Sequence, residues 1–123
     1  MMKLLESGEM YLETILILKQ KNGNTRAIDV GEYMGFTKPS VSRAMGLLRN
    51  NGYITTDSEG YISLTESGAE VANKMLERHR LLTDFLIHLG VNEKTATDDA
   101  CKMEHAISDE SFEAIKNHAQ RKH

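Results

Sequence analysis

Hydrophobic positions recur with helical spacing near the start of this chain, in two segments separated by turn-forming residues. The first segment predicts a helix over about residues 6–21, ended by the stop signal Asn22-Gly23-Asn24. Its apolar stripe consists of Leu12, Ile15, Leu16 and Leu18. The second predicts a helix over about residues 27–34, with Thr25 as a start signal and Gly35-Phe36 as the turn that follows.

A third amphipathic segment and two β-prone segments follow at once. Thr37 is expected to cap a helix that stops at Asn50-Asn51-Gly52, with Pro39 in the first turn, where its missing N–H costs nothing. The inward face of this helix is predicted to consist of Val41, Ala44, Leu47 and Leu48. Residues 53–56 and 61–64 flank an acidic turn and predict a β-hairpin.

The second half of the chain has a helical pattern throughout. A long helix is predicted over about residues 66–89, and two more over about residues 93–107 and 109–121, with Ser108 as the N-cap between them. The apolar positions of the long helix are Val71, Met75, Leu82, Phe85, Leu86 and Leu89.

The fold class that follows is mainly α with a small β-hairpin. Residues 1–64 are expected to form a winged helix-turn-helix domain, and residues 65–123 an all-α domain. No linker rich in Gly, Ser or Pro separates the two, so the helix over residues 65–89 is expected to join them rigidly.

Composition and charge narrow the class of protein. The chain has 123 residues, 40% of them hydrophobic and 27% charged, as in an ordinary globular domain. It has no apolar run of roughly 20 residues and no secretion signal, and its single cysteine cannot form an internal disulfide. We therefore expect a cytoplasmic protein without membrane contact.

The net charge of −3 argues against unselective binding to nucleic acid, but the charge is unevenly spread. Residues 37–52 contain three cations and no acid, and a basic helix of this kind is able to bind DNA with strong salt dependence. The residues expected to contact DNA from this helix are Thr37, Lys38, Pro39, Ser40, Ser42, Arg43 and Arg49. The alternative is a solvated helix in a protein–protein adaptor.

Residue chemistry suggests how these side chains meet DNA. Hydroxyls at a helix N-terminus suit phosphate, and the Arg43 guanidinium suits a guanine edge. Arg26 and the hairpin, or wing, are expected to contact the DNA backbone. The acids Asp57 and Glu59 make the wing a weak contributor.

A second chemical feature lies near the C-terminus, where Cys101, Glu104 and His105 fall at i, i+3 and i+4. On a helix these positions share one face, so a thiolate, a carboxylate and an imidazole point the same way. The soft sulfur disfavours Mg²⁺ and Ca²⁺ and leaves Fe²⁺, Co²⁺, Ni²⁺ and Zn²⁺ open. The alternative for a lone helical cysteine is a small buried hydrophobe.

The chain resembles the diphtheria toxin repressor family of iron- or manganese-dependent transcriptional repressors. The matching segments span nearly the whole sequence: residues 9–12, 38–42, 79–81, 100–105 and 108–110. The resemblance implies a homodimer, not an enzyme, that binds Fe²⁺ or Mn²⁺ as corepressor and then grips a palindromic operator in double-stranded DNA. The C-terminal SH3-like domain of longer family members is not expected here. We expect dimer contacts from Ile107, Phe112 and Ile115.

The resemblance also implies metal ligands. The primary site of the iron-sensing branch falls on Met10, Cys101, Glu104 and His105, all of which have the matching residue type. Thioether and thiolate are softer donors than the paired carboxylates that Mn²⁺ prefers. Fe²⁺ is therefore expected over Mn²⁺, with Co²⁺, Ni²⁺ or Zn²⁺ as substitutes.

A second site is implied by the manganese branch. Glu13 and His79 match its ligands and would share Glu104 with the primary site. Two ancillary positions of the iron branch fall instead on Thr83 and Thr97, which are poor ligands.

Two other functions stay open. One is a metal-independent or redox-responsive winged-helix regulator, whose DNA binding would not respond to chelation. The other is a metalloenzyme or metal carrier. The sequence disfavours this second alternative because it contains no Gly-rich phosphate loop, nucleophile elbow or His-Glu-x-x-His motif.

Overall fold

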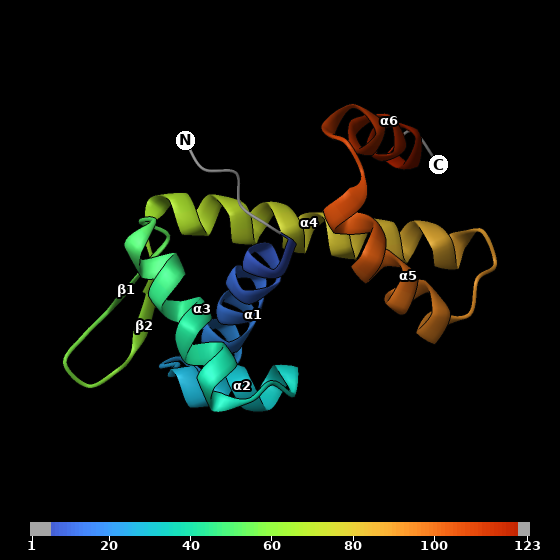
Figure 1. The fold of residues 1–123 in the computed structure, drawn as a ribbon. Coiled ribbons are helices and arrows are strands. Elements are labelled where there is room, and N and C mark those ends of the chain that lie inside the picture. The colour runs from blue at the N-terminus through green and yellow to red at the C-terminus, as the bar shows by residue number, and fades with distance from the viewer. Residues whose placement is uncertain (1–5, 121–123) are drawn as a thin grey trace. The chain divides into compact units, whose positions relative to one another are not determined.

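The computed structural model describes residues 6–120 (Figure 1). Within that range the elements are, in order, α1 (Glu6–Asn22), α2 (Ala27–Met34), α3 (Lys38–Asn50), β1 (Ile54–Thr56), β2 (Ile62–Leu64), α4 (Glu66–His88), α5 (Glu93–Ala106) and α6 (Asp109–Gln120). The predicted fold class is confirmed, and the predicted element ends agree with these to within one residue, except that the predicted end at residue 121 lies outside the described residues. None of the described helices combines the length and the apolar character that a membrane crossing requires.

The chain divides into two compact units, residues 1–74 and 75–123, so the boundary falls inside α4. The sequence pattern predicts a boundary between residues 64 and 65 instead. The first turns of α4 belong to the first unit because Ala72 is completely buried in that unit's hydrophobic core and Val71 packs against it.

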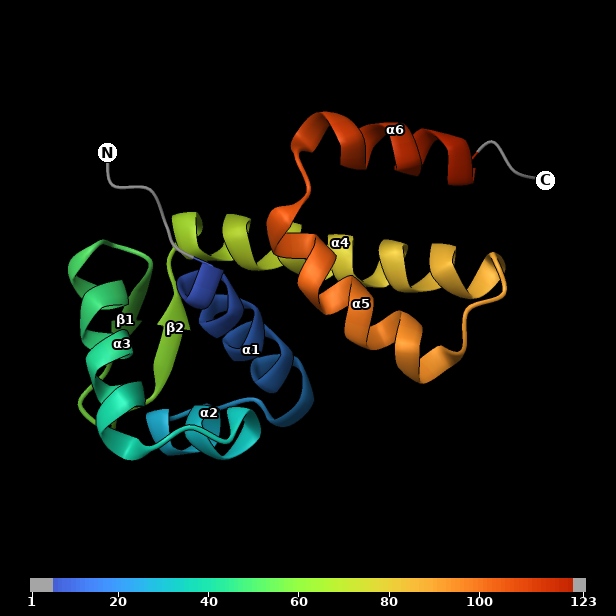
Figure 2. The ribbon, with the colours of Figure 1, turned by 45° about the vertical axis from the view of Figure 1, so that its right-hand side comes forward.

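The first unit contains α1, α2, α3 and the hairpin, which lie around one hydrophobic core (Figure 2). The strands β1 and β2 pair antiparallel, with Thr55 opposite Ser63. The largest fully buried aliphatic side chains of this core are Leu12, Ile15, Val30, Val41, Ile54 and Ile62. Burying an aliphatic side chain of this size stabilises a fold by about 1.5–3 kcal/mol.

The inward face of α3 differs from the prediction at two positions, Met45 and Leu47. Val41, Met45 and Leu48 are buried, at spacings of four and three residues, whereas Leu47 is 57% exposed. A helical residue next to a buried one is turned about 100° away from it, and here the core lies on the side of Met45 and Leu48. Leu47 therefore lies on the outer surface of α3.

The turn between α2 and α3 depends on one glycine. Gly35 has a φ of 74°, in the left-handed region, and its N–H donates to the carbonyl of Gly31 at 2.8 Å. After this turn Thr37 caps α3, as predicted. The next residue after Gly35, Phe36, packs edge-on against Tyr11 with ring centroids 5.9 Å apart. Burial raises the pKa of Tyr11.

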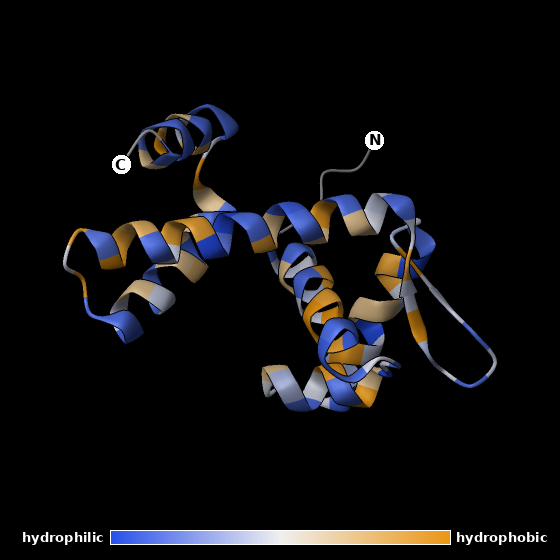
Figure 3. Ribbon diagram, turned by 180° about the vertical axis from the view of Figure 1, so that it is seen from behind, coloured by the Kyte–Doolittle hydropathy of each residue, from blue (hydrophilic) through white to orange (hydrophobic). Residues whose placement is uncertain are grey.

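The second unit has a smaller core, formed by Leu82, Ala100 and Phe112. Figure 3 shows hydrophobic and hydrophilic residues alternating along α4. Leu82 of this helix supplies one side of the core. Leu89 was predicted to join the apolar stripe of α4 but is 66% exposed. The helix ends at His88, and the chain then turns at Gly90, where φ is 104°.

Candidate metal centre and nucleic-acid interface

The second unit holds one carboxylate between two imidazoles. Glu104 on α5 is completely buried. Its Oε1 lies 2.9 Å from Nδ1 of His79 on α4, and its Oε2 lies 3.3 Å from Nε2 of His105. The side chain of His79 is 26% exposed and that of His105 only 1%. Burial of an ionised carboxylate is costly unless cations or hydrogen bonds compensate it. A buried acid of this kind is therefore a candidate ligand for a cation.

The local sequence of α5 explains why Glu104 is buried. The buried residues of this helix are Ala96, Ala100 and Glu104, each four residues after the last. They form a single stripe along one face of the helix. The carboxylate is therefore carried inward by the same face that forms the core.

The other predicted ligands lie on the same helix or on α1. Cys101 is exposed and lies one helical turn before Glu104 on α5. On α1, in the first unit, Met10 is half-buried and Glu13 is buried. The structure of the second unit thus brings together three predicted ligands, His79, Glu104 and His105.

The types of these donor atoms suit a divalent transition metal, because carboxylate oxygen and imidazole nitrogen both bind Mn²⁺ and Fe²⁺. The two threonines at the ancillary positions add no strong donor. The hydroxyl of Thr97 donates to the carbonyl of Glu93 at 2.9 Å, and that of Thr83 is buried.

The N-terminus of α3 presents the predicted DNA-contacting residues. Lys38, Pro39, Ser42 and Arg43 are exposed. Thr37 has a structural role as well, because its Oγ1 accepts from the N–H of Ser40 at 3.4 Å and donates to the Ser40 hydroxyl at 3.0 Å.

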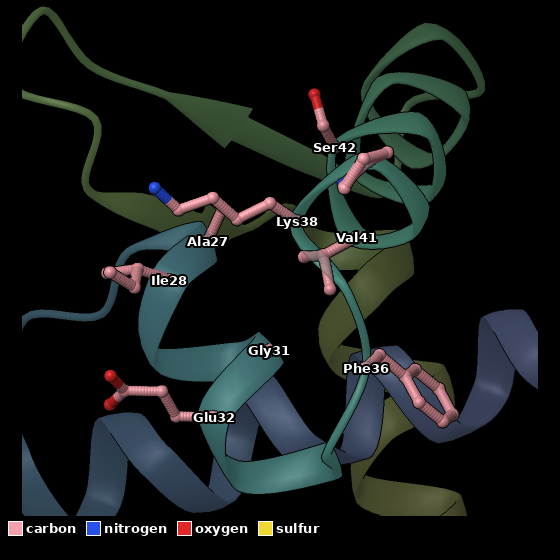
Figure 4. Close-up of a pocket in the computed structure, with 9 residues that line it drawn as sticks. Ala27, Ile28, Gly31, Glu32, Phe36, Lys38, Val41 and Ser42 are labelled. Carbon is pink, nitrogen blue, oxygen red and sulfur yellow. The ribbon is translucent and has the colours of Figure 1, made fainter.

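A pocket between α2 and α3 lies beside this helix start (Figure 4). Its apolar lining includes Ile28, Phe36 and Val41, and its polar lining consists of Lys38, Ser42 and the acid Glu32. The surface next to α3 is thus partly apolar, which suits contact with base methyl groups.

Two of the predicted DNA-contacting arginines are tied to the wing. Nε of Arg26 donates to the carbonyl of Glu59 at 3.0 Å, and its guanidinium carbon lies 4.5 Å from the ring centroid of Tyr61. Nε of Arg49 lies 3.3 Å from the hydroxyl oxygen of Thr56. Sequence reasoning missed these contacts, because the pairing of a side chain with a distant hairpin leaves no local signal.

The acid Asp57 shapes the wing rather than simply repelling DNA. Its Oδ1 accepts from the N–H groups of Glu59 and Tyr61, both at 2.9 Å. This is the Asx-type bonding that stabilises tight turns. The presence of an acid at position 57 is therefore explained by its role in stabilising the hairpin turn.

The predicted dimer contacts occupy different environments within the second unit. Phe112 is only 3% exposed and belongs to the core of its own chain. Ile107 and Ile115 are partly buried against that core and keep some accessible surface. Because Phe112 is buried already in a single chain, it has little area left to contribute to an interface.

Two domain families match almost the whole sequence of this chain. Residues 3–62 match the N-terminal DNA binding domain of iron dependent repressors, and residues 65–121 match their metal binding and dimerisation domain. The fold and the site thus define a transcriptional regulator with a DNA-binding and a metal-binding domain. The chain belongs to the iron-dependent repressor family, of the diphtheria toxin repressor and manganese regulator type, whose members are DNA-binding repressors and not enzymes.

Individual relatives with similar sequences are also transcriptional regulators. An HTH-type transcriptional regulator of Methanocaldococcus jannaschii is 37% identical over 113 residues, covering 90% of each chain. The transcriptional regulator MntR of Escherichia coli is 32% identical over 111 residues, covering 90% of this chain and 72% of the relative.

Solved structures of similar proteins share the fold. A manganese-dependent transcriptional repressor in complex with manganese has a TM-score of 0.81 at 28% identity, and the match covers 89% of this chain and 51% of that one. The metal-dependent transcriptional regulator MtsR has a TM-score of 0.85 at 26% identity, covering 92% and 53%. The chain thus spans about half the length of these two solved structures.

Proposed function

We propose that this chain is a cytoplasmic repressor that binds a palindromic operator in double-stranded DNA as a homodimer when Fe²⁺ or Mn²⁺ is bound, and so controls metal homeostasis genes. The observation that carries the proposal is the buried carboxylate of Glu104 beside the imidazoles of His79 and His105. The match of residues 65–121 to a metal binding and dimerisation domain supports it.

The proposed ligands follow the family pattern. The primary site takes Met10, Cys101, Glu104 and His105, and a second site takes Glu13 and His79 together with Glu104. The burial of Glu13 and Glu104, two acids, supports their assignment. A bound divalent cation supplies the positive charge that offsets the burial of such carboxylates.

Fe²⁺ is the preferred metal in this proposal. Met10 and Cys101 offer a thioether and a thiolate, which are softer than the oxygen donors that favour Mn²⁺. Mn²⁺ is the alternative, because the similar solved structures include the manganese regulator SloR and a manganese-dependent transcriptional repressor. Co²⁺, Ni²⁺ and Zn²⁺ are expected to substitute in vitro.

DNA recognition is assigned to the outer face of α3. Lys38 and Arg43 are exposed there and would contact phosphate and base edges. Arg26 and Arg49 would act partly by holding the wing, since both donate to it. In a homodimer the two recognition helices would lie about one DNA turn, roughly 34 Å, apart.

Homodimer formation is assigned to the last two helices. Ile107 and Ile115 keep apolar surface for a second copy of the chain, while Phe112 supports them from the core. Metal then acts as a corepressor only if the metal-bound state binds operator better than the metal-depleted state. A coupling free energy of about 1–3 kcal/mol corresponds to about 5–150-fold tighter operator binding.

The proposal is tested by DNA binding with and without metal. The probe is a duplex selected from a random-sequence library in the presence of Mn²⁺, and binding is followed by fluorescence anisotropy in excess chelator, Fe²⁺ or Mn²⁺. Affinity should rise about 5–150-fold with metal. Glu104→Gln should abolish that gain, and Glu113→Gln, an exposed acid on α6, should retain it. Equal affinity in chelator and in metal would overturn the proposal and favour a metal-independent or redox-responsive regulator.

A further inference from the structure

Arg78 is a buried arginine at the meeting point of three helices in the second unit. It lies on α4, and its side chain is 5% exposed. Its Nη1 donates to the main-chain carbonyls of Glu104 at 2.9 Å and Ile107 at 2.8 Å. Its Nη2 donates to the carboxylate of Asp109, and its guanidinium carbon lies 5.3 Å from the ring centroid of Phe112.

These contacts join the end of α5 to the start of α6. The carbonyl of Glu104 belongs to the last turn of α5, where carbonyls lack partners within the helix, and that of Ile107 belongs to the C-cap residue just after it. Asp109 is the first residue of α6, where a negative charge is favoured. The planar guanidinium, with several fixed N–H groups, donates to the end of α5 and to the first side chain of α6 at once, which a lysine ammonium cannot do with the same geometry.

We infer that Arg78 is a positioning residue that serves the two activities of this domain. Through the main-chain carbonyl of Glu104 it fixes the residue whose carboxylate faces His79 and His105. Through Asp109 it fixes the start of α6, the helix that carries Ile115. This inference rests on the proposed function, because it assigns Glu104 to metal binding and α6 to dimer formation.

Arg78 thus acts through two arms, one to the carbonyl of Glu104 and one to the carboxylate of Asp109, and the structure provides a matched control for each. Arg80 is an exposed arginine on the same helix, so Arg80→Lys controls for the change of residue type. A second link between α4 and α6 joins Lys116 Nζ to Glu77 Oε2 at 2.7 Å, and this hydrogen bond raises the pKa of Lys116. That pair is solvent-accessible, and exposed ion pairs contribute little, so Glu77→Gln controls for loss of an α4–α6 ion pair.

The test measures Mn²⁺ affinity by calorimetry and dimer dissociation by sedimentation, at a temperature where circular dichroism shows each variant folded. Arg78→Lys should weaken Mn²⁺ binding about 10–100-fold, the usual effect of losing a group that orients a ligand. It should also weaken the dimer. Asp109→Asn removes only the α6 arm, so it should weaken the dimer up to about fivefold and leave Mn²⁺ affinity unchanged. Both controls should match wild type.

Three outcomes would overturn this inference or its basis. Folded Arg78→Lys with wild-type Mn²⁺ affinity would show that Arg78 is merely structural. If Arg78→Lys does not fold, an unchanged dimer in Asp109→Asn would still refute the inference. Failure of the wild-type chain itself to bind either Mn²⁺ or Fe²⁺ would instead refute the proposed function, and the two failures are thereby distinguished.

Discussion

Nδ1 of His79 lies 2.9 Å from Oε1 of Glu104, although the two residues are 25 positions apart in the chain. The contact joins α4 to α5 through a carboxylate that is completely buried. It is the structural basis for assigning this part of the chain to metal sensing.

The preference for Fe²⁺ depends on Cys101. Cys101→Ala removes the thiolate, so the dissociation constant for Fe²⁺ should rise by about tenfold or more. The dissociation constant for Mn²⁺ should rise less. Anaerobic competition with a metal-responsive dye measures both constants. Lys102→Ala, at the exposed neighbouring position, should leave both unchanged. Equal effects of Cys101→Ala on the two metals would remove the argument for iron.

DNA binding should depend on Arg43 without affecting metal binding. Arg43→Ala removes an exposed cation from the recognition helix, and loss of a base contact costs about 1–3 kcal/mol. Fluorescence anisotropy with the selected duplex should show correspondingly weaker binding, while calorimetry shows wild-type metal affinity. Lys94→Ala, which removes an exposed cation from α5, is the control. Wild-type DNA affinity in Arg43→Ala would refute its role.

Two glycines in helices should respond in opposite ways to alanine. A Cβ at Gly68 in α4 would lie 2.0 Å from the backbone oxygen of Tyr53, so Gly68→Ala should destabilise the fold in spite of the better helix propensity of alanine. A Cβ at Gly46 in α3 would meet no atom within 4 Å, so Gly46→Ala should stabilise by about 0.5–1 kcal/mol. Urea unfolding measures both. Stabilisation by Gly68→Ala would contradict the packing described for α4.

The inward face of α3 is tested by a pair of truncations. Met45→Ala should cost about 2–5 kcal/mol of unfolding free energy, because Met45 is 2% exposed in the core. Leu47→Ala should change stability by about 0.5 kcal/mol or less, because Leu47 is 57% exposed. Comparable losses in thermal unfolding for the two variants would argue that Leu47 packs in the core after all.

Periodicity in the sequence predicted the helices and the hairpin because their signals are local. Thr37 before Pro39 signals a helix start, and Asn50-Asn51-Gly52 signals a stop, without reference to the rest of the chain. The choice between Leu47 and Met45 failed because several apolar residues lie close together on α3, and only packing decides which of them face inward.

The site was predictable to a smaller extent. Glu104 and His105 could be singled out because their spacing from Cys101 places ligand types on one helix face. The contacts of Arg78 with Glu104 and Asp109, and of Arg26 with Glu59, join residues far apart in sequence. Such pairings are set by tertiary packing, and a single sequence carries no periodic pattern that would indicate them.

The most direct test of the central claim is an anaerobic calorimetric titration of the metal-depleted chain with Fe²⁺ and, separately, with Mn²⁺. We predict saturable binding of both metals by the wild-type chain, tighter for Fe²⁺, and its loss in Glu104→Gln. A stoichiometry of about two metals per chain would assign the second to Glu13 and His79. Absence of saturable binding, or binding that Glu104→Gln leaves unchanged, would contradict the metal-sensing account.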